Sequence, residues 1–164
     1  RSTLFPYTTL FRSGRRYIDI MSDPSANTPI NWWASGFFRS RGLLEVFNRR
    51  PPSLEGAICS RMLIEHFPED ARLTVELADT PDPLPTRWAR RGHNALRLYL
   101  RISDLSYLHV RGSLTGGLCC IRITSSPRGV TTAIWNDVYE AKIAAQYGYF
   151  SQMEAFHRDA PATL

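Results

Sequence analysis

Residues 81–102 read PDPLPTRWARRGHNALRLYLRI, and the 164-residue chain is organised around this stretch. Its second half alternates strictly, and the apolar positions are Leu96, Leu98, Leu100 and Ile102. Such alternation predicts a half-buried β-strand that turns one face towards the core. Three prolines in the first half predict a stiff turn that brings Trp88 to the head of this strand. We therefore expect the neighbouring strands to pack around this stretch.

The rest of the chain contains further short apolar runs that are separated by turn residues. The runs cover residues 57–67, 72–78, 105–111, 118–124, 130–135 and 139–147. Alternation in the first run is imperfect, which predicts a strand with an irregularity, and its closeness to the second run predicts a hairpin. Asp104 interrupts the alternation between the central strand and the run that follows it. The pattern predicts a mostly β protein with a single antiparallel sheet that is curled or closed.

Aromatic residues and a short helical pattern precede the first of these strands. The aromatic residues are Trp32, Trp33, Phe37 and Phe38, and we expect them to plug one end of the sheet. Residues 40–47 have helical apolar spacing, with Ser40 in position to cap the helix. This segment predicts a short N-terminal helix that is held by packing.

The C-terminal tail has a different periodicity from the strands. Phe150, Met153 and Phe156 follow one another at intervals of three residues. Spacing of this kind is consistent with a short C-terminal helix that docks on the sheet.

The N-terminal residues do not fit a protein domain. Residues 3–13, TLFPYTTLFRS, resemble one reading frame of a sequencing adapter left in an assembled sequence. Met21, which precedes a polar run, is the start that we expect. Residues 1–20 are then a non-native extension, and residues 21–164 form one β-rich domain with a core over about 32–147.

The formal charge of +5 depends largely on that extension. Without residues 1–20 the balance falls to about +2, which argues against a nucleic-acid partner. No run reaches the roughly 20 apolar residues of a membrane span, so no membrane partner is expected. Three cysteines, two of them the neighbours Cys119 and Cys120, do not form an ordinary disulfide framework, although Cys59 could pair with either or neither. A reducing cytoplasm fits this cysteine usage best.

The sequence contains no pattern that predicts catalysis, a cofactor or a metal. Its histidines are His66, His93, His109 and His157, and none has a second ligand at metal-binding spacing. Asp79 and Asp82 flank a proline in a loop, where carboxylates usually form solvated turns. We expect a non-enzymatic protein without catalytic, cofactor or metal residues.

Partner binding is the function that the exposed residues favour. If the apolar face of the central strand is buried, Arg97, Tyr99 and Arg101 face outward, and Arg122 of a later strand could share their surface. The competing interpretation is that Glu76 and Glu140 pair with these arginines across strands. A second candidate surface is formed by three residues beside the proline turn, namely Trp88, Arg90 and Arg91.

The order of short motifs resembles the immunity protein 50 family of bacterial polymorphic-toxin systems. The matching features are an aromatic-led helix that ends at Phe47, the P-S-L at residues 52–54, the proline loop into Trp88, Asn94 before an L-x-L-x-L strand, and D-L-x-x-L-x-V-R-G at residues 104–112. The resemblance spans about residues 32–147. It implies a mostly β protein that binds a cognate toxin, without catalysis, to protect the producing cell.

Two other classes of function stay open. One is a small enzyme with a hydrophobic pocket, for which Cys119, His109 or Asp104 would have to line an open pocket. The other is a small-ligand-binding or structural β module, which a large dry core would favour.

Overall fold

The computed structural model describes residues 32–65, 69–113 and 118–159. The strands in these residues are β1 (Phe37–Phe38), β2 (Ile58–Glu65), β3 (Asp70–Leu77), β4 (Ala95–Gly112), β5 (Cys119–Ser126), β6 (Gly129–Trp135) and β7 (Tyr139–Phe156). The helices are α1 (Arg41–Val46) and α2 (Thr86–Ala89). The predicted non-native extension, residues 1–20, and His66 lie outside the described residues.

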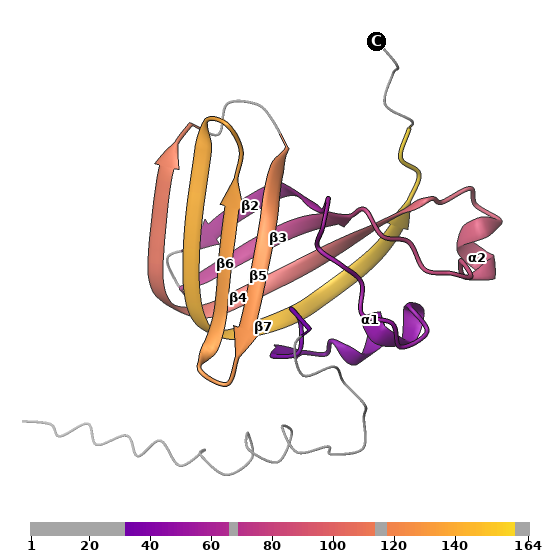
Figure 1. Cartoon of the computed structure of the whole chain (residues 1–164), viewed down its shortest axis with the longest axis horizontal. Helices are drawn as coiled ribbons and strands as arrows, with labels where there is room; N and C mark the ends of the chain where they lie inside the picture. Colours follow the sequence, from indigo (N-terminus) through magenta and orange to yellow (C-terminus); the bar gives the residue numbers. More distant parts are fainter. Residues whose placement is uncertain (1–31, 66–68, 114–117, 160–164) are drawn as a thin grey trace, which may run out of the picture.

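The sheet closes on itself, as Figure 1 shows. Neighbouring strands follow the order β2-β3-β4-β7-β6-β5, and β5 pairs in turn with β2. Every pair in this ring is antiparallel. The long strands β4 and β7 pair with each other over most of their length. On its other edge the first half of β4 pairs with β3, and the first half of β7 pairs with β6. A mostly β fold is therefore confirmed.

The prediction of a purely antiparallel sheet is wrong at β1. This two-residue strand pairs in parallel with β7, with Phe37 beside Gly148 and Phe38 beside Tyr149. The Phe37 ring occupies the space that a side chain at position 148 would need, since a Cβ there would lie 2.8 Å from the ring. Glycine at this position thus allows the N-terminal segment to lie against β7.

Strand β4 contains the sequence stretch that predicts the core. Its apolar positions from Leu96 to Ile102 are at most 2% exposed, which confirms the predicted facing. Asp104 was expected to end the strand, but β4 continues to Gly112. Asp104 has a φ of +58°, and the register with β7 shifts between Leu105 and Tyr107. The irregularity is therefore a bulge that bends one strand, and the two predicted strands are one.

The predicted C-terminal helix is wrong, because β7 runs on to Phe156. Residues from Phe150 to Phe156 pair with the first half of β4. Leu100 lies opposite Phe150 and Tyr99 lies opposite Gln152, so Ser151 is an extra residue in β7. This bulge separates the inward-facing Phe150 and Met153 by three residues, which imitates helical spacing in the sequence.

The β2–β3 hairpin confirms the prediction for residues 57–78. Its register shifts between Cys59 and Arg61, and this bulge explains the imperfect alternation of the sequence. The helix predicted at residues 40–47 is α1, although Ser40 forms no side-chain cap hydrogen bond. Packing of Leu43, which is 2% exposed, holds α1 in place instead.

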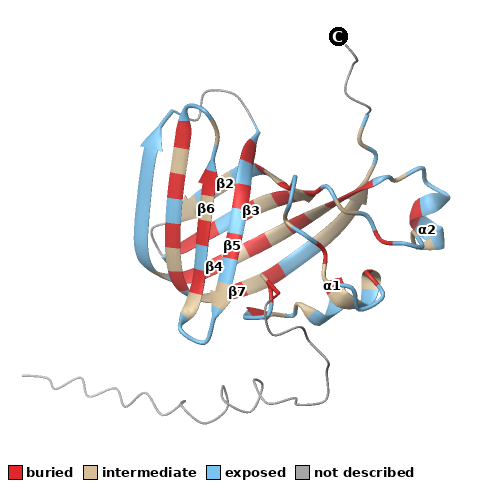
Figure 2. Cartoon of the chain, in the orientation of Figure 1, coloured by how far each residue is buried: buried red, intermediate tan, exposed pale blue. Residues whose placement is uncertain are grey.

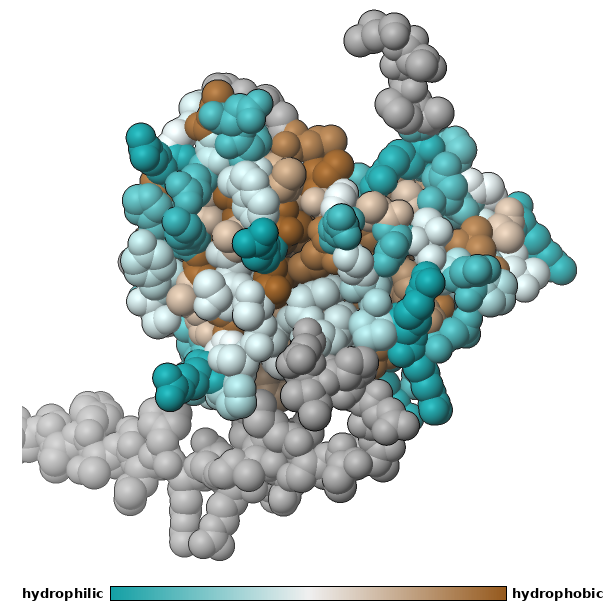
Figure 3. Space-filling model, in the orientation of Figure 1, coloured by the Kyte–Doolittle hydropathy of each residue, from teal (hydrophilic) through white to brown (hydrophobic). Residues whose placement is uncertain are grey.

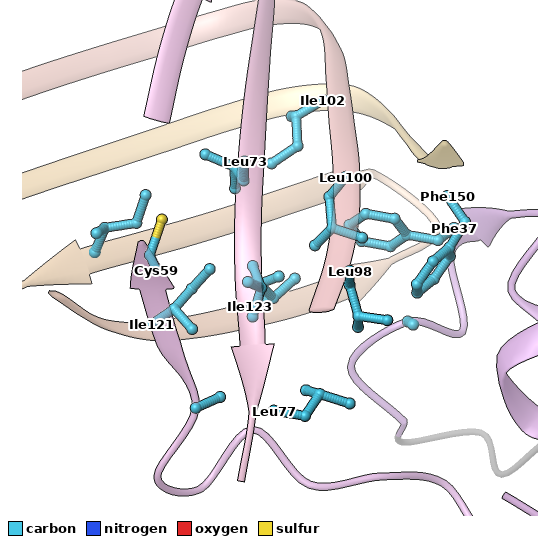
Figure 4. Close-up of a cluster of buried hydrophobic side chains, with 14 of the residues drawn as sticks. Phe37, Cys59, Leu73, Leu77, Leu98, Leu100, Ile102, Ile121, Ile123 and Phe150 are labelled. Atoms are coloured by element: carbon cyan, nitrogen blue, oxygen red, sulfur yellow. The ribbon is translucent and has the colours of Figure 1, made fainter. Parts of the chain in front are cut away.

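Aliphatic side chains from all sides of the ring fill its interior. Figure 2 shows buried and exposed residues alternating along the strands, and Figure 4 shows several of the buried side chains converging. The core positions that the alternation predicts are all at most 5% exposed: Leu73, Val75, Leu77, Leu96, Leu98, Leu100, Ile102, Ile121 and Ile123. Trp32 and Phe37 are also buried and extend the core at one end, whereas the Phe38 ring stacks on Tyr149 with centroids 4.9 Å apart.

Gly112 ends β4 at a position that no side chain can occupy. Its φ is +93°, and a Cβ would lie 1.9 Å from the backbone oxygen of Val138. We expect Gly112→Ala to destabilise the fold by about 1–3 kcal/mol in urea unfolding. Gly42→Ala in α1 is the control, because a Cβ there meets nothing within 4 Å and should improve helix propensity. Equal stability of the two variants would contradict the close approach of Gly112 to the backbone of Val138.

Candidate functional site

The predicted candidates Arg97, Tyr99 and Arg101 lie together on the outer face of β4. Cross-strand neighbours on β3 are Glu76, Thr74 and Arg72, and β7 flanks the other side. All three candidate residues are partly exposed. Their outward orientation follows from the burial of the leucines between them.

Arg97 is held by contacts within the chain. Its guanidinium donates to the Glu76 carboxylate at 2.9 Å and lies 4.3 Å from the centroid of the Phe156 ring. The hydrogen bond to Glu76 raises the pKa of Arg97 above its ordinary value. Arg158 donates to the other Glu76 oxygen at 3.3 Å. The predicted competing interpretation, pairing with Glu76, is therefore correct for Arg97, whereas Glu140 pairs with Lys142.

Tyr99 and Arg101 also have partners, but their surroundings differ. The Tyr99 hydroxyl donates to Glu154 at 2.7 Å. Arg101 Nε donates to Asp70 at 2.6 Å, and the Asp70 side chain is only 1% exposed. The Asp70 carboxylate is thus buried, whereas the Arg101 side chain that pairs with it is 42% exposed.

Beside these two residues the outer face is hollowed into a depression of about 450 Å³. We call it the arginine depression and define it by Arg61 and Leu63 of β2, Arg72 of β3, and Tyr99 and Arg101 of β4. Leu63 is 41% exposed there, and Arg72 pairs with Glu65 at 2.8 Å. The depression therefore combines three guanidinium groups with exposed apolar and aromatic surface.

Arg61 is the least neutralised cation of the arginine depression. It is exposed, and among the described residues no carboxylate forms an ion pair with it. Sequence reasoning missed Arg61 and Arg72 as site residues. The predicted β2–β3 hairpin could have indicated them. A residue that lies opposite an outward-facing residue of the neighbouring strand also faces outward.

Arg122 does not share this surface, contrary to the prediction. Its facing is as expected, since Ile121 and Ile123 are buried, but β5 is separated from β4 by two strands in either direction around the ring. Arg122 instead lies over the Trp135 ring, 5.6 Å from the centroid. Outer faces on different sides of a closed sheet point in different directions, so correct facing did not bring these arginines together.

Arg122 borders a second hollow, of about 480 Å³. We call it the tryptophan slot and define it by Trp33, Leu54, Ile58, Ile121, Arg122 and Trp135. It lies where β5 and the segment before β2 diverge. Figure 3 shows that the face of the protein seen in Figure 1 is hollowed and carries apolar surface among more hydrophilic surroundings. The Trp33 indole donates to the Pro52 oxygen at 2.8 Å, which fixes one wall of the slot.

The second predicted surface, around Trp88, is only partly accessible. Trp88 lies in α2 and is 7% exposed, so it belongs to the core and not to a binding surface. Arg90 and Arg91 at the end of α2 are exposed. They do not line the arginine depression.

The residues of the predicted enzyme alternative line neither the arginine depression nor the tryptophan slot. Cys119 is buried on β5, whereas Asp104 and His109 are exposed on β4 and line neither hollow. Within residues 32–65, 69–113 and 118–159, no three potential metal-ligating side chains gather as a cluster. No helix in the same ranges is long and apolar enough to cross a membrane.

Comparison of the chain with models of protein families, with curated proteins and with solved structures finds no match in any of the three.

Proposed function

We propose that the protein is a non-catalytic immunity protein that binds a bacterial toxin in the cytoplasm of the producing cell and neutralises it. The order of sequence motifs suggests this class, and the arginine depression is the structural observation that supports it. Arginine and tyrosine are enriched among residues that dominate binding energy. A shallow open hollow with Leu63 at its rim suits a protein surface better than an enclosed small molecule.

The charges of the arginine depression indicate the chemistry of the partner. Two of its three guanidinium groups have carboxylate partners, since Arg72 pairs with Glu65 and Arg101 pairs with the buried Asp70. The accessible surface is thus positive, and an acidic patch on the toxin would complement it. Electrostatic attraction of this kind accelerates association at low salt, so we expect the association rate to fall as salt is added.

Survival of a bacterial host tests the function directly. Toxin domains encoded beside this gene are expressed alone and together with residues 21–164. The proposal expects growth to be restored by co-expression with one of these toxins and not with unrelated toxins. If none of the neighbouring toxins is neutralised, the immunity function is wrong.

Tyr99 should contribute most to binding among the predicted residues. We expect Tyr99→Ala to weaken binding of the neutralised toxin by about 2 kcal/mol, or roughly 30-fold in Kd, because it removes an aromatic side chain from the depression. Arg61→Ala should slow association, since it removes a cation that no described carboxylate neutralises. Calorimetric titration measures the first effect and stopped-flow mixing the second.

Arg122→Ala is the matched control for these variants, because it removes an exposed arginine from a different side of the sheet. It should bind like the parent protein. If Arg97, Tyr99 and Arg101 can each be replaced by alanine in folded protein without loss of affinity, the interface lies elsewhere.

The tryptophan slot supports a second candidate function, binding of a small apolar ligand. Its walls expose Trp135, which is 36% accessible, beside the Arg122 guanidinium. Titration with an anilinonaphthalene sulfonate, an aromatic anion, tests this function by fluorescence. Saturable binding that Arg122→Ala and Trp135→Ala abolish would favour a ligand-binding module over toxin recognition.

A further inference from the structure

We propose that Cys59 and Cys119 are a disulfide-forming pair that locks the closed sheet when the protein meets a small-molecule disulfide oxidant. The inference is independent of the proposed function. It rests on the position of both cysteines in the junction between β2 and β5, which has the fewest residue pairs of the ring in the described part of the chain. We call this junction the β2–β5 seam.

Among the described residues, the β2–β5 seam contains two residue pairs. Ile58 lies opposite Cys120, and Cys59 lies opposite Cys119. By comparison, β3 and β4 pair over eight residues, from Asp70 to Leu77. Closure of the ring on this side therefore depends on two described residues from each strand. A covalent bond there would reinforce the junction that has the fewest hydrogen-bonded residue pairs.

The register gives Cys59 and Cys119 the separation that a disulfide needs. Residues directly opposite in an antiparallel pair have Cα atoms about 4.5–5.5 Å apart, and disulfides join Cα atoms about 4.4–6.8 Å apart. Both cysteines are 5% exposed and belong to the same core cluster. Their side chains thus lie on the same inner face of the seam.

Cys120 is the third thiol and faces the other way. It is exposed, and it lines the tryptophan slot. Successive side chains of a strand point to opposite faces, so Cys120 cannot reach Cys59 without a change of register. The structure therefore selects one pair from the three possible pairs.

In the closed seam both thiols are protected from reaction. Cys59 donates to the Arg61 backbone oxygen at 3.3 Å. Burial raises the pKa of Cys59 to about 12, and burial also raises the pKa of Cys119. Only the thiolate attacks a disulfide, so reaction requires the seam to open. Two residue pairs make such local opening less costly than opening of the longer junctions.

The reaction is a balanced exchange with oxidised glutathione. One cysteine thiolate attacks a sulfur of the glutathione disulfide and releases one glutathione thiolate. The second cysteine thiolate then attacks the mixed disulfide and releases the other glutathione. The two cysteines are oxidised, their two thiol protons pass through the solvent to the two released glutathione thiolates, and the oxidant is reduced to two thiols.

The cross-link should stabilise the fold measurably. It closes a loop of about 60 residues and so restricts the unfolded chain. For a domain of this size we expect the midpoint of thermal unfolding to rise by about 5–15 °C. The effect should reverse when the protein is reduced.

The test uses the full chain with Cys120→Ser, which leaves only the proposed pair. Folded protein is incubated with oxidised glutathione, alkylated, and analysed by mass spectrometry and thermal unfolding. We expect both thiols to disappear, a mass loss of two hydrogen atoms, a peptide that links Cys59 to Cys119, and a higher midpoint. A matched variant with Cys119→Ala and Cys120→Ser should show neither the cross-link nor the rise in midpoint.

Three results would overturn the proposal. The folded protein could retain both thiols under conditions that oxidise the urea-unfolded chain. It could hold one glutathione as a stable mixed disulfide, which would show that the second thiol does not reach the first. Finally, the cross-link could form without raising the midpoint, which would show that it does not lock the closed sheet.

Discussion

Replacing Leu98 with alanine is expected to lower the free energy of unfolding by about 2–5 kcal/mol. Leu98 is 0% exposed and lies on β4 between Val75 of β3 and Met153 of β7. Because it is surrounded on both sides by paired strands, the site cannot collapse to fill the space that the leucine leaves. Urea unfolding monitored by tryptophan fluorescence measures the loss.

Leu63→Ala is the matched control for Leu98→Ala. It deletes the same side chain from β2, but Leu63 faces outward and is 41% exposed. We expect a change within about 0.5 kcal/mol, as for most surface substitutions. Similar losses in the two variants would mean that the inner and outer faces of the sheet have been assigned wrongly.

Arg101→Ala is expected to cost about 3 kcal/mol, because it leaves the Asp70 carboxylate buried without its ion-pair partner. The cost should lie at the low end for a buried ion pair, since the Arg101 side chain is 42% exposed and its charge is partly screened by water. Chemical unfolding at neutral pH measures the difference from the parent protein.

The double variant Asp70→Asn with Arg101→Ala separates the charge from the packing. Without the buried carboxylate, we expect part of the lost stability to return. Arg101→Ala alone at parental stability would show that Asp70 does not depend on this guanidinium. The same control matters for toxin binding, because a loss of affinity in Arg101→Ala counts only where the variant is folded.

The two hollows of the outer surface have different chemical character. The arginine depression is positive, and most of its cations have carboxylate partners within the chain. The tryptophan slot is mainly apolar, and in the described part of the chain Arg122 forms no ion pair beside it. A partner that binds the arginine depression must compete with Glu65 for Arg72 and with Glu154 for the Tyr99 hydroxyl. A ligand that binds the tryptophan slot meets no such competition at Arg122 from the described carboxylates. Variants on the two sides therefore distinguish the two candidate functions.

Facing along individual strands could be predicted from the sequence. Leucines at every second position from Leu96 to Leu100 are buried because the side-chain period of a strand is two. The β2–β3 hairpin and helix α1 followed from local turn and apolar patterns as well. These features depend on neighbours in the chain, so one sequence contains enough information to predict them.

Bulges were the main cause of wrong predictions. The bulge at Asp104 looked like the end of a strand, and the extra residue Ser151 gave the tail of β7 a helical spacing. A bulge changes the phase of the apolar pattern without ending the strand, and the partner strand decides whether pairing continues. Sequence periodicity alone cannot distinguish these outcomes.

Strict alternation in the first half of β4 and in β5 was enough to predict which of their residues face inward, and therefore that Arg97, Tyr99, Arg101 and Arg122 face outward. Which of these residues share a surface depends on the pairing of the strands, which the sequence pattern does not contain. The order of strands around the ring separates Arg122 from β4. Pairing of β3 with both β2 and β4 brings Arg61 and Arg72 to Tyr99 and Arg101. It also places Cys59 opposite Cys119 across the seam. Facing is a local property of the backbone period, whereas proximity depends on long-range pairing that closes loops of many residues.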